Sequence, residues 1–185
     1  MEFIETKLPG VIRLKPKVFK DTRGFFLDYH HEEVFAKAGI TARFVQDSHS
    51  YSQERGVIRG MHFQLPPSTQ AKIVRVIRGA VFDVVLDLRV GSPTFGKWAS
   101  FELSAENFEM LFIPRGLAHG FCTTVAQTEM LYKLDNLYAP TLESGVRWDD
   151  PELAIPWPTS QATISLKDAE HLRLSEIKSP FVFDN

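Results

Sequence analysis

Short β-forming runs separated by glycine and proline constrain the fold of this chain more than any other feature. Turn signals recur about every eight to twelve residues, a spacing that is typical of all-β sandwiches and barrels. The predicted strands are residues 11–14, 24–29, 44–50, 57–63, 71–77, 80–88, 98–103, 108–113, 120–124, 130–134 and 145–148. We therefore expect an all-β jelly-roll barrel in which residues 1–185 form a single domain.

Helices are expected only at the periphery of this barrel. Residues 31–38 form the clearest predicted helix, because acidic residues begin it and Gly39 follows as a cap. A second short helix is expected to follow Asp168, which could be its N-cap. Frequent prolines after residue 139 indicate a looping C-terminal third.

Composition narrows the class of protein. The chain is 44% hydrophobic and 24% charged, which is ordinary for a globular protein, and its net charge of −2 argues against a nucleic-acid partner. Cys122, the single cysteine, excludes an intrachain disulfide and lies in an apolar run, so buried packing is favoured over reactivity. The start resembles no signal peptide and no stretch approaches the ~18 apolar residues of a membrane helix, so a cytoplasmic protein is expected.

Two glycine-bounded segments, RGMHFQ at 59–64 and IPRGLAHGF at 113–121, each carry one histidine, His62 and His119. Lys72 follows the first segment and Tyr132 the second. These side chains supply a base, an acid and two partners for an oxyanion, which suits proton removal beside a carbonyl. A barrel metal site usually adds a histidine at i+2 and a carboxylate; Gln64 stands at i+2, so we expect neither metal nor cofactor.

His62 is the candidate base, and its alternative is a core histidine. A neutral imidazole needs a partner that fixes its tautomer, and Asp168 is one possible carboxylate. Lys72 shares a strand face with Val74 and Val76. It therefore either faces a wet cavity or reaches solvent at the strand end.

Tyr132 shares a face with Met130 and Leu134, so it is either a cavity-facing proton donor or a core tyrosine. Arg59, with Lys72 and His119, could stabilise an enolate oxygen or bind a phosphate. Arg23 could clamp a diphosphate or be a surface turn arginine. Gly60 is expected to allow a close backbone approach or a bulge.

Seven motifs in order carry a family resemblance that extends from about residue 3 to residue 168. They are RGFF at 23–26, FVQD at 44–47, RGMHFQ at 59–64, SPTFG at 92–96, LSAEN at 103–107, IPRGLAHGF at 113–121 and LYK at 131–133. The chain resembles the dTDP-4-dehydrorhamnose 3,5-epimerases. The resemblance implies a cupin-type double-stranded β-helix with short peripheral helices, a homodimer, and metal-free action on a dTDP-4-keto-6-deoxy sugar in the route to L-rhamnose.

The resemblance also assigns roles by motif position. His62 matches the base, Asp168 the carboxylate that orients it, Tyr132 the proton donor and Lys72 the residue that steadies the enolate, with His119 nearby. The positions matched to nucleotide, diphosphate or sugar contacts are Arg23, Phe26, Asp28, Gln46, Ser48, Arg59, His119, Tyr138, Glu143 and Lys167.

Three residues depart from the family pattern on the nucleotide or sugar side. Ser48 stands where Asn is common, Asp28 where Glu is usual, and Leu137 lies in a variable patch. The base and acid positions are unaffected. The alternatives are a single-centre epimerase or 3,4-ketoisomerase of another dTDP-4-keto-deoxysugar pathway, a metal-dependent cupin oxygenase, and a non-catalytic sugar-nucleotide binding module.

Overall fold

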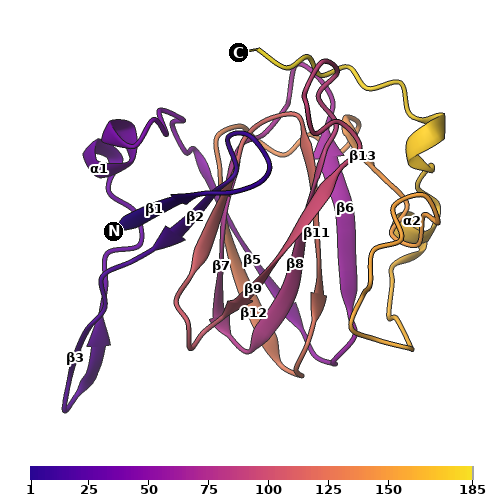
Figure 1. The fold of residues 1–185 in the computed structure, drawn as a ribbon. Helices are drawn as coiled ribbons and strands as arrows, with labels where there is room; N and C mark the ends of the chain where they lie inside the picture. Colours follow the sequence, from indigo (N-terminus) through magenta and orange to yellow (C-terminus); the bar gives the residue numbers. More distant parts are fainter. Residues whose placement is uncertain (185) are drawn as a thin grey trace.

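A computed structural model describes residues 1–184, and two antiparallel sheets face each other in it (Figure 1). The six-stranded sheet comprises, in spatial order, β1 (Glu2–Glu5), β2 (Ile12–Lys15), β10 (Met110–Ile113), β7 (Lys72–Arg78), β12 (Thr128–Leu134) and β5 (Gln46–Ser52). The five-stranded sheet comprises β13 (Glu143–Gly145), β6 (Ile58–Gln64), β11 (Leu117–Thr123), β8 (Ala80–Asp87) and β9 (Trp98–Ser104). The chain passes repeatedly between the two sheets, which confirms the predicted jelly roll.

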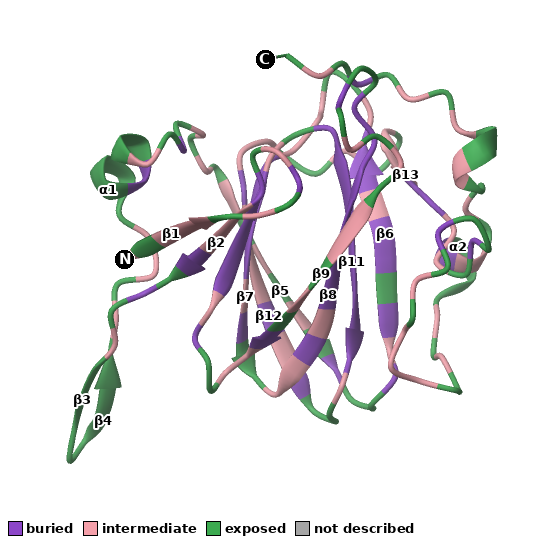
Figure 2. Ribbon diagram, in the orientation of Figure 1, coloured by how far each residue is buried: buried purple, intermediate pink, exposed green. Residues whose placement is uncertain are grey.

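A two-stranded hairpin stands apart from the barrel. β3 (Phe19–Asp21) pairs with β4 (Gly24–Phe26), and the hairpin projects away from both sheets in Figure 1. All six of its strand residues are exposed, whereas buried residues concentrate on the barrel strands in Figure 2.

The main core lies between the sheets because strand alternation turns every second side chain inward. Val74 and Val76 of β7 pack in one cluster with Val81 and Val85 of β8 and with Phe121 of β11. This packing fixes the inner faces of β7 and β11, the strands that carry Lys72 and His119.

Each sheet is also covered on its outer face. The helix α1 (Glu32–Lys37) buries Phe35 in a cluster with Leu14 and Met110 of the six-stranded sheet. Leu153 and Phe181 of the C-terminal segment pack with Met61 and Leu86 of the five-stranded sheet. The C-terminal segment contains α2 (Leu166–Ala169) and the 3₁₀ helix η1 (Leu174–Glu176), and α2 lies beside β6 (Figure 1).

The structure corrects several predicted boundaries. Every predicted strand overlaps an observed one, but β1 and β3 were not predicted, and the strand predicted at 24–29 ends at Phe26. The expectation that a helix follows Asp168 is wrong: Asp168 lies inside α2, and the N-cap is Ser165, whose Oγ accepts from the Asp168 backbone N–H at 3.1 Å. A serine that caps three residues earlier releases the carboxylate of Asp168 for other contacts.

Cys122 is buried, as predicted, and burial raises the pKa of its thiol to about 11. In residues 1–184, no helix combines the length and the apolar character needed to cross a bilayer.

Candidate active site

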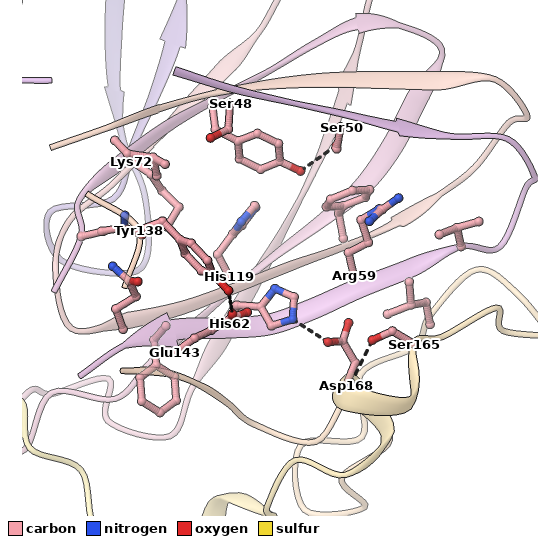
Figure 3. A pocket seen from close by; sticks show the side chains of 18 of the residues that line it. Ser48, Ser50, Arg59, His62, Lys72, His119, Tyr138, Glu143, Ser165 and Asp168 are labelled. Atoms are coloured by element: carbon pink, nitrogen blue, oxygen red, sulfur yellow. Dashed lines mark hydrogen bonds and ion pairs between the residues drawn. The ribbon is translucent and has the colours of Figure 1, made fainter. Parts of the chain in front are cut away.

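A cavity of about 660 Å³ opens between the two sheets (Figure 3). Strands β5, β7 and β12 supply one wall, β6, β11 and β13 supply the other, and the segment leading into α2 closes one side. Its polar lining residues are Ser48, His49, Ser50, Arg59, His62, Gln64, Gln70, Lys72, His119, Tyr132, Tyr138, Glu143, Thr163, Ser165 and Asp168. The four predicted catalytic residues, His62, Lys72, Tyr132 and Asp168, therefore line one cavity.

His62 and Asp168 form the central pair of this cavity. His62 Nε2 lies 2.7 Å from Asp168 Oδ1, and the Gly60 backbone N–H donates to Asp168 Oδ2 at 3.1 Å. Burial alone would raise the pKa of Asp168, but the hydrogen bond and charge of His62, together with the hydrogen bonds from Gly60 and Ser165, outweigh it and the pKa is lowered. An ionised carboxylate accepts Nε2–H and leaves the lone pair on Nδ1 as the basic nitrogen.

Lys72 begins β7 and faces inward. Its residue is only 9% exposed, so the alternative of a strand-end lysine reaching solvent is wrong. Burial lowers its pKa to about 8, against the opposing charges of Asp83 and Glu143. The ammonium is therefore mostly protonated near neutral pH and is shielded from water.

A second buried histidine–carboxylate pair lies deeper in the barrel. His119 Nε2 is 2.8 Å from Asp83 Oδ2, and the exposed fractions of the two side chains are 4% and 0%. On β11, His119 stands directly opposite His62 of β6. Asp83 was assigned no role in the sequence analysis. Its place on the same strand face as the inward-facing Val81 and Val85 was a signal that could have identified it.

Tyr132 projects from the sheet opposite His62. Its hydroxyl lies 3.1 Å from Ser50 Oγ on the neighbouring strand β5, and Ser50 is labelled in Figure 3. Burial raises the pKa of the phenol to about 12, so the hydroxyl is protonated at neutral pH. The cavity thus holds a basic nitrogen on one wall and a phenolic proton on the other.

Glu143 organises the mouth of the cavity. Its Oε2 accepts hydrogen bonds from the Tyr138 hydroxyl and the Lys167 ammonium. Burial would raise the pKa of Glu143, but these two bonds together with the charges of His62 and Lys167 outweigh it and the pKa is lowered. Gln46 Oε1 accepts from the Tyr138 backbone N–H at 2.9 Å, and Gln46 Nε2 donates to Ser48 Oγ at 3.1 Å. Five predicted contact residues therefore meet at this mouth.

Arg59 lines the cavity from β6. Its guanidinium donates to Ser52 Oγ at 3.2 Å and to the Tyr51 carbonyl at 3.0 Å, both on β5. These bonds hold the cation at the edge where the two sheets approach, in a position suited to an anionic ligand.

Three predicted contact residues lie elsewhere. Arg23 and Phe26 belong to the β3–β4 hairpin and line a separate shallow hollow, where Arg23 forms an ion pair with Asp21 at 2.5 Å. Asp28 is exposed just after the hairpin and is not among the cavity lining. Within one chain, the structure does not bring these three residues to the cavity.

One group of side chains in residues 1–184 has ligand atoms close enough to hold a metal. It consists of His62, Asp168 and His171, whose ligand atoms all lie within 4.8 Å of one another. Sequence spacing did not reveal this group, because His171 reaches His62 only through the docking of the C-terminal segment.

Comparison with known proteins shows which family the chain is similar to. A sequence profile described as dTDP-4-dehydrorhamnose 3,5-epimerase matches residues 5–176. The chain is 47% identical over 169 residues to a dTDP-4-dehydrorhamnose 3,5-epimerase of Shigella flexneri, covering 91% of this chain and 93% of that protein. It is also 43% identical over 172 residues to a dTDP-4-dehydrorhamnose 3-epimerase of Streptomyces niveus, covering 92% and 83%.

A solved structure is similar over the whole chain. It is a dTDP-6-deoxy-D-glucose-3,5-epimerase of Legionella pneumophila Philadelphia 1 in complex with dTDP-4-keto-L-rhamnose. The two share 40% sequence identity with a TM-score of 0.95, and the match covers 100% of this chain and 99% of the other.

Proposed function

Because the chain belongs to the dTDP-4-dehydrorhamnose 3,5-epimerase family, we propose that it inverts C3 and C5 of dTDP-4-dehydro-6-deoxy-D-glucose to give dTDP-4-dehydro-L-rhamnose. The observation that carries the proposal is the His62–Asp168 pair in a cavity whose opposite wall holds the Tyr132 hydroxyl. A base and an acid on facing walls are what inversion of a carbon requires.

The first step removes a proton beside the ketone. The C4 carbonyl acidifies the hydrogens on C3 and C5, and Nδ1 of His62 takes one of them. Asp168 keeps the second ring proton on Nε2 and stabilises the imidazolium that forms. The electron pair of the broken C–H bond moves into the enolate, with the negative charge on O4.

Lys72 stabilises that oxygen. Its ammonium is buried, and a charged donor in a water-poor cavity is worth more than the same donor in water. His119, whose ring is oriented by Asp83, lies on the facing sheet and completes the polar surroundings of the oxygen.

Inversion requires the carbon to be reprotonated from its other face. Tyr132 supplies that proton, because its phenol is protonated and projects from the sheet opposite His62. The nucleotide and diphosphate bind along the cavity, between Arg59 at one end and Tyr138 and Glu143 at the other, and hold the sugar while each carbon is presented in turn.

The test is solvent exchange in deuterated water, with isotope position and product configuration read by NMR. The wild-type protein should place deuterium at C3 and C5 and produce the L-configured sugar. His62→Ala should abolish exchange at both carbons, whereas His31→Ala, at an exposed histidine outside the cavity, should behave as wild type. Normal exchange in His62→Ala would refute the base assignment.

Tyr132→Phe separates the acid from the base. The variant should retain exchange and lose inversion, because the enolate still forms but receives its proton back on the original face. Equal loss of exchange and inversion would show that Tyr132 is not the specific acid. The readout is the ratio of deuterium uptake to product formation under identical conditions.

A single-centre epimerase is the second candidate, supported by the 43% identity to the 3-epimerase of Streptomyces niveus. It uses the same base and enolate chemistry. The same NMR experiment distinguishes the two candidates: deuterium at C3 alone, with D-configured C5, would establish the second one.

The proposal includes a homodimer in which the β3–β4 hairpin of one protomer serves the cavity of its partner. Arg23, Phe26 and Asp28 match substrate-contact positions of the family, yet they lie away from the cavity of their own chain. Phe26 is 64% exposed and Phe25 is 57% exposed, which supports a partner for this hairpin.

We further propose that residues 1–185 act as one catalytic domain, which the profile match over residues 5–176 supports. The cytoplasmic location stays a prediction.

A further inference from the structure

His171 has no part in the proposed chemistry, yet its ring is held beside the catalytic pair. Its side chain is 10% exposed, and its Nε2 is buried without a hydrogen-bond partner among residues 1–184. That nitrogen lies 3.8 Å from Asp168 Oδ1, too far for a good hydrogen bond. A buried nitrogen aimed at a carboxylate that it does not reach needs an explanation.

The surroundings leave room for this imidazole. Gly145 of β13 stands opposite His62 in the strand register, and a Cβ at Gly145 would lie 2.4 Å from both Nε2 and Cδ2 of the His171 ring. The rings of His62 and His171 are 5.7 Å apart and nearly perpendicular. Glycine at this position therefore lets the second imidazole approach the first.

We propose that His62, Asp168 and His171 bind Zn²⁺, and that the bound ion switches the enzyme off. Two imidazoles and one carboxylate are a recurrent zinc ligand set. The three ligand atoms already lie within 4.8 Å of one another. Zinc bonds of about 2.0–2.2 Å place tetrahedral ligand atoms roughly 3.3–3.6 Å apart. Binding thus requires His62 and Asp168, at 2.7 Å, to separate and Asp168 and His171, at 3.8 Å, to close. The two imidazole nitrogens, within 4.8 Å of each other, must also reach this spacing.

The carboxylate is oriented for this role by groups outside the ligand set. The Gly60 backbone N–H holds Asp168 Oδ2 at 3.1 Å and leaves Oδ1 directed at the two rings. The Ser165 cap fixes the short helix that carries Asp168. Such hydrogen bonds to a ligand raise metal affinity. The His62 side chain is 30% exposed and lines the cavity, and in the proposed site a water molecule is the fourth ligand.

The inhibition follows from the tautomer of His62, and this step rests on the proposed function. Zinc takes the Nε2 lone pair, so the neutral ring holds its single N–H proton on Nδ1 instead of on Nε2, where Asp168 would accept it. An Nδ1–H cannot take a proton from C3 or C5. The ion therefore blocks the base while it leaves the cavity open to the sugar nucleotide.

The binding test needs no substrate. Cobalt(II) added to the wild-type protein should give the intense visible bands of a tetrahedral site, and zinc should remove them at one equivalent. His171→Asn should weaken zinc binding roughly tenfold or more, measured against a chromophoric chelator. His31→Asn, which removes an exposed histidine next to Glu32 and Glu33, should bind zinc as the wild-type protein does.

Absence of the cobalt bands in the wild-type protein would overturn the proposal, whatever the folding of the variants. Equal zinc affinity in wild-type protein and a His171→Asn variant with an intact thermal transition would also overturn it. In the activity arm, zinc should slow wild-type exchange relative to its zinc-free rate, EDTA should restore it, and His171→Asn should need roughly tenfold more zinc. Zinc binding without inhibition would retain the site but refute its effect on His62.

Discussion

At the scale of single residues, charged groups buried in the cavity lower the free energy of unfolding. Lys72 carries that cost most clearly, because its pKa falls from 10.5 to about 8 on burial. The unfolded chain therefore binds more protons than the folded one between these values, and the free energy of unfolding should rise with pH across this window. Below pH 8, the buried charge opposes folding by about 3 kcal/mol.

Lys72→Met should therefore stabilise the protein at pH 7 by about 2–3 kcal/mol while abolishing epimerisation. The gain should shrink from pH 8 to pH 10.5, where the wild-type lysine is already neutral in the folded state. Urea unfolding at pH 7 and pH 10 measures both values. Lys97→Met, at an exposed lysine, is the control and should change neither. A destabilised Lys72→Met variant at pH 7 would contradict the account.

Asp168→Asn tests orientation of the base with little change in shape. An amide can offer N–H to His62 Nε2 and so stabilise the tautomer that carries its proton on Nδ1. We expect kcat to fall by roughly 10³- to 10⁴-fold with a smaller change in KM. Asp149→Asn, at a carboxylate paired with Arg147 outside the cavity, should retain full activity. Steady-state kinetics of both variants test this prediction. A near-normal kcat in Asp168→Asn would refute the proposal that the carboxylate orients His62.

At the scale of elements, the contact between β6 and β11 positions both histidines. The register of these strands shifts between His119 and Phe121, and a Cβ on Gly60 would lie 2.4 Å from the Gly120 Cα. The predicted close approach at Gly60 is confirmed. Because the obstructing atom is backbone, neither strand can yield without moving His62 or His119.

Gly60→Ala should destabilise the protein by more than about 2 kcal/mol, since it adds a backbone clash to a positive φ. Gly91→Ala is a matched control: Gly91 also has a positive φ, but a Cβ there meets nothing within 4 Å. That variant should lose only about 1 kcal/mol. Chemical denaturation measures the stability of both variants. Equal losses of stability would show that the close contact between β6 and β11 adds nothing to the cost of Gly60→Ala.

At the scale of the whole molecule, the hairpin proposal predicts that two inactive variants restore each other. Arg23→Ala damages the hairpin, and His62→Ala damages the cavity. If the hairpin serves the partner, a mixed dimer has one site with both residues intact. Random mixing should then recover roughly a quarter of the wild-type rate. The measurement is deuterium exchange by co-refolded mixtures of the two variants. A mixture as inactive as its components would place Arg23 and His62 in the site of the same chain.

The sequence predicted what depends on local pattern. Alternation placed Lys72 on an inward face, and glycine-bounded motifs located His62 and His119 on strands that prove to be neighbours. The sequence did not predict contacts that depend on tertiary packing. The pairing of His119 with Asp83 joins two strands whose register no local signal fixes. The position of α2 depended on Ser165, a cap that competes with Asp168 for the same helix start.

The positions of His62 and Asp168, the proposed catalytic pair, along the chain have a consequence for synthesis. The ribosome delivers every barrel strand before it delivers Asp168, and α2 must then dock beside β6 to complete the pair. A nascent chain could thus close its barrel and still lack an oriented base. Competence for proton abstraction therefore requires synthesis past residue 168, so a chain that stalls before Asp168 should leave the sugar nucleotide unchanged.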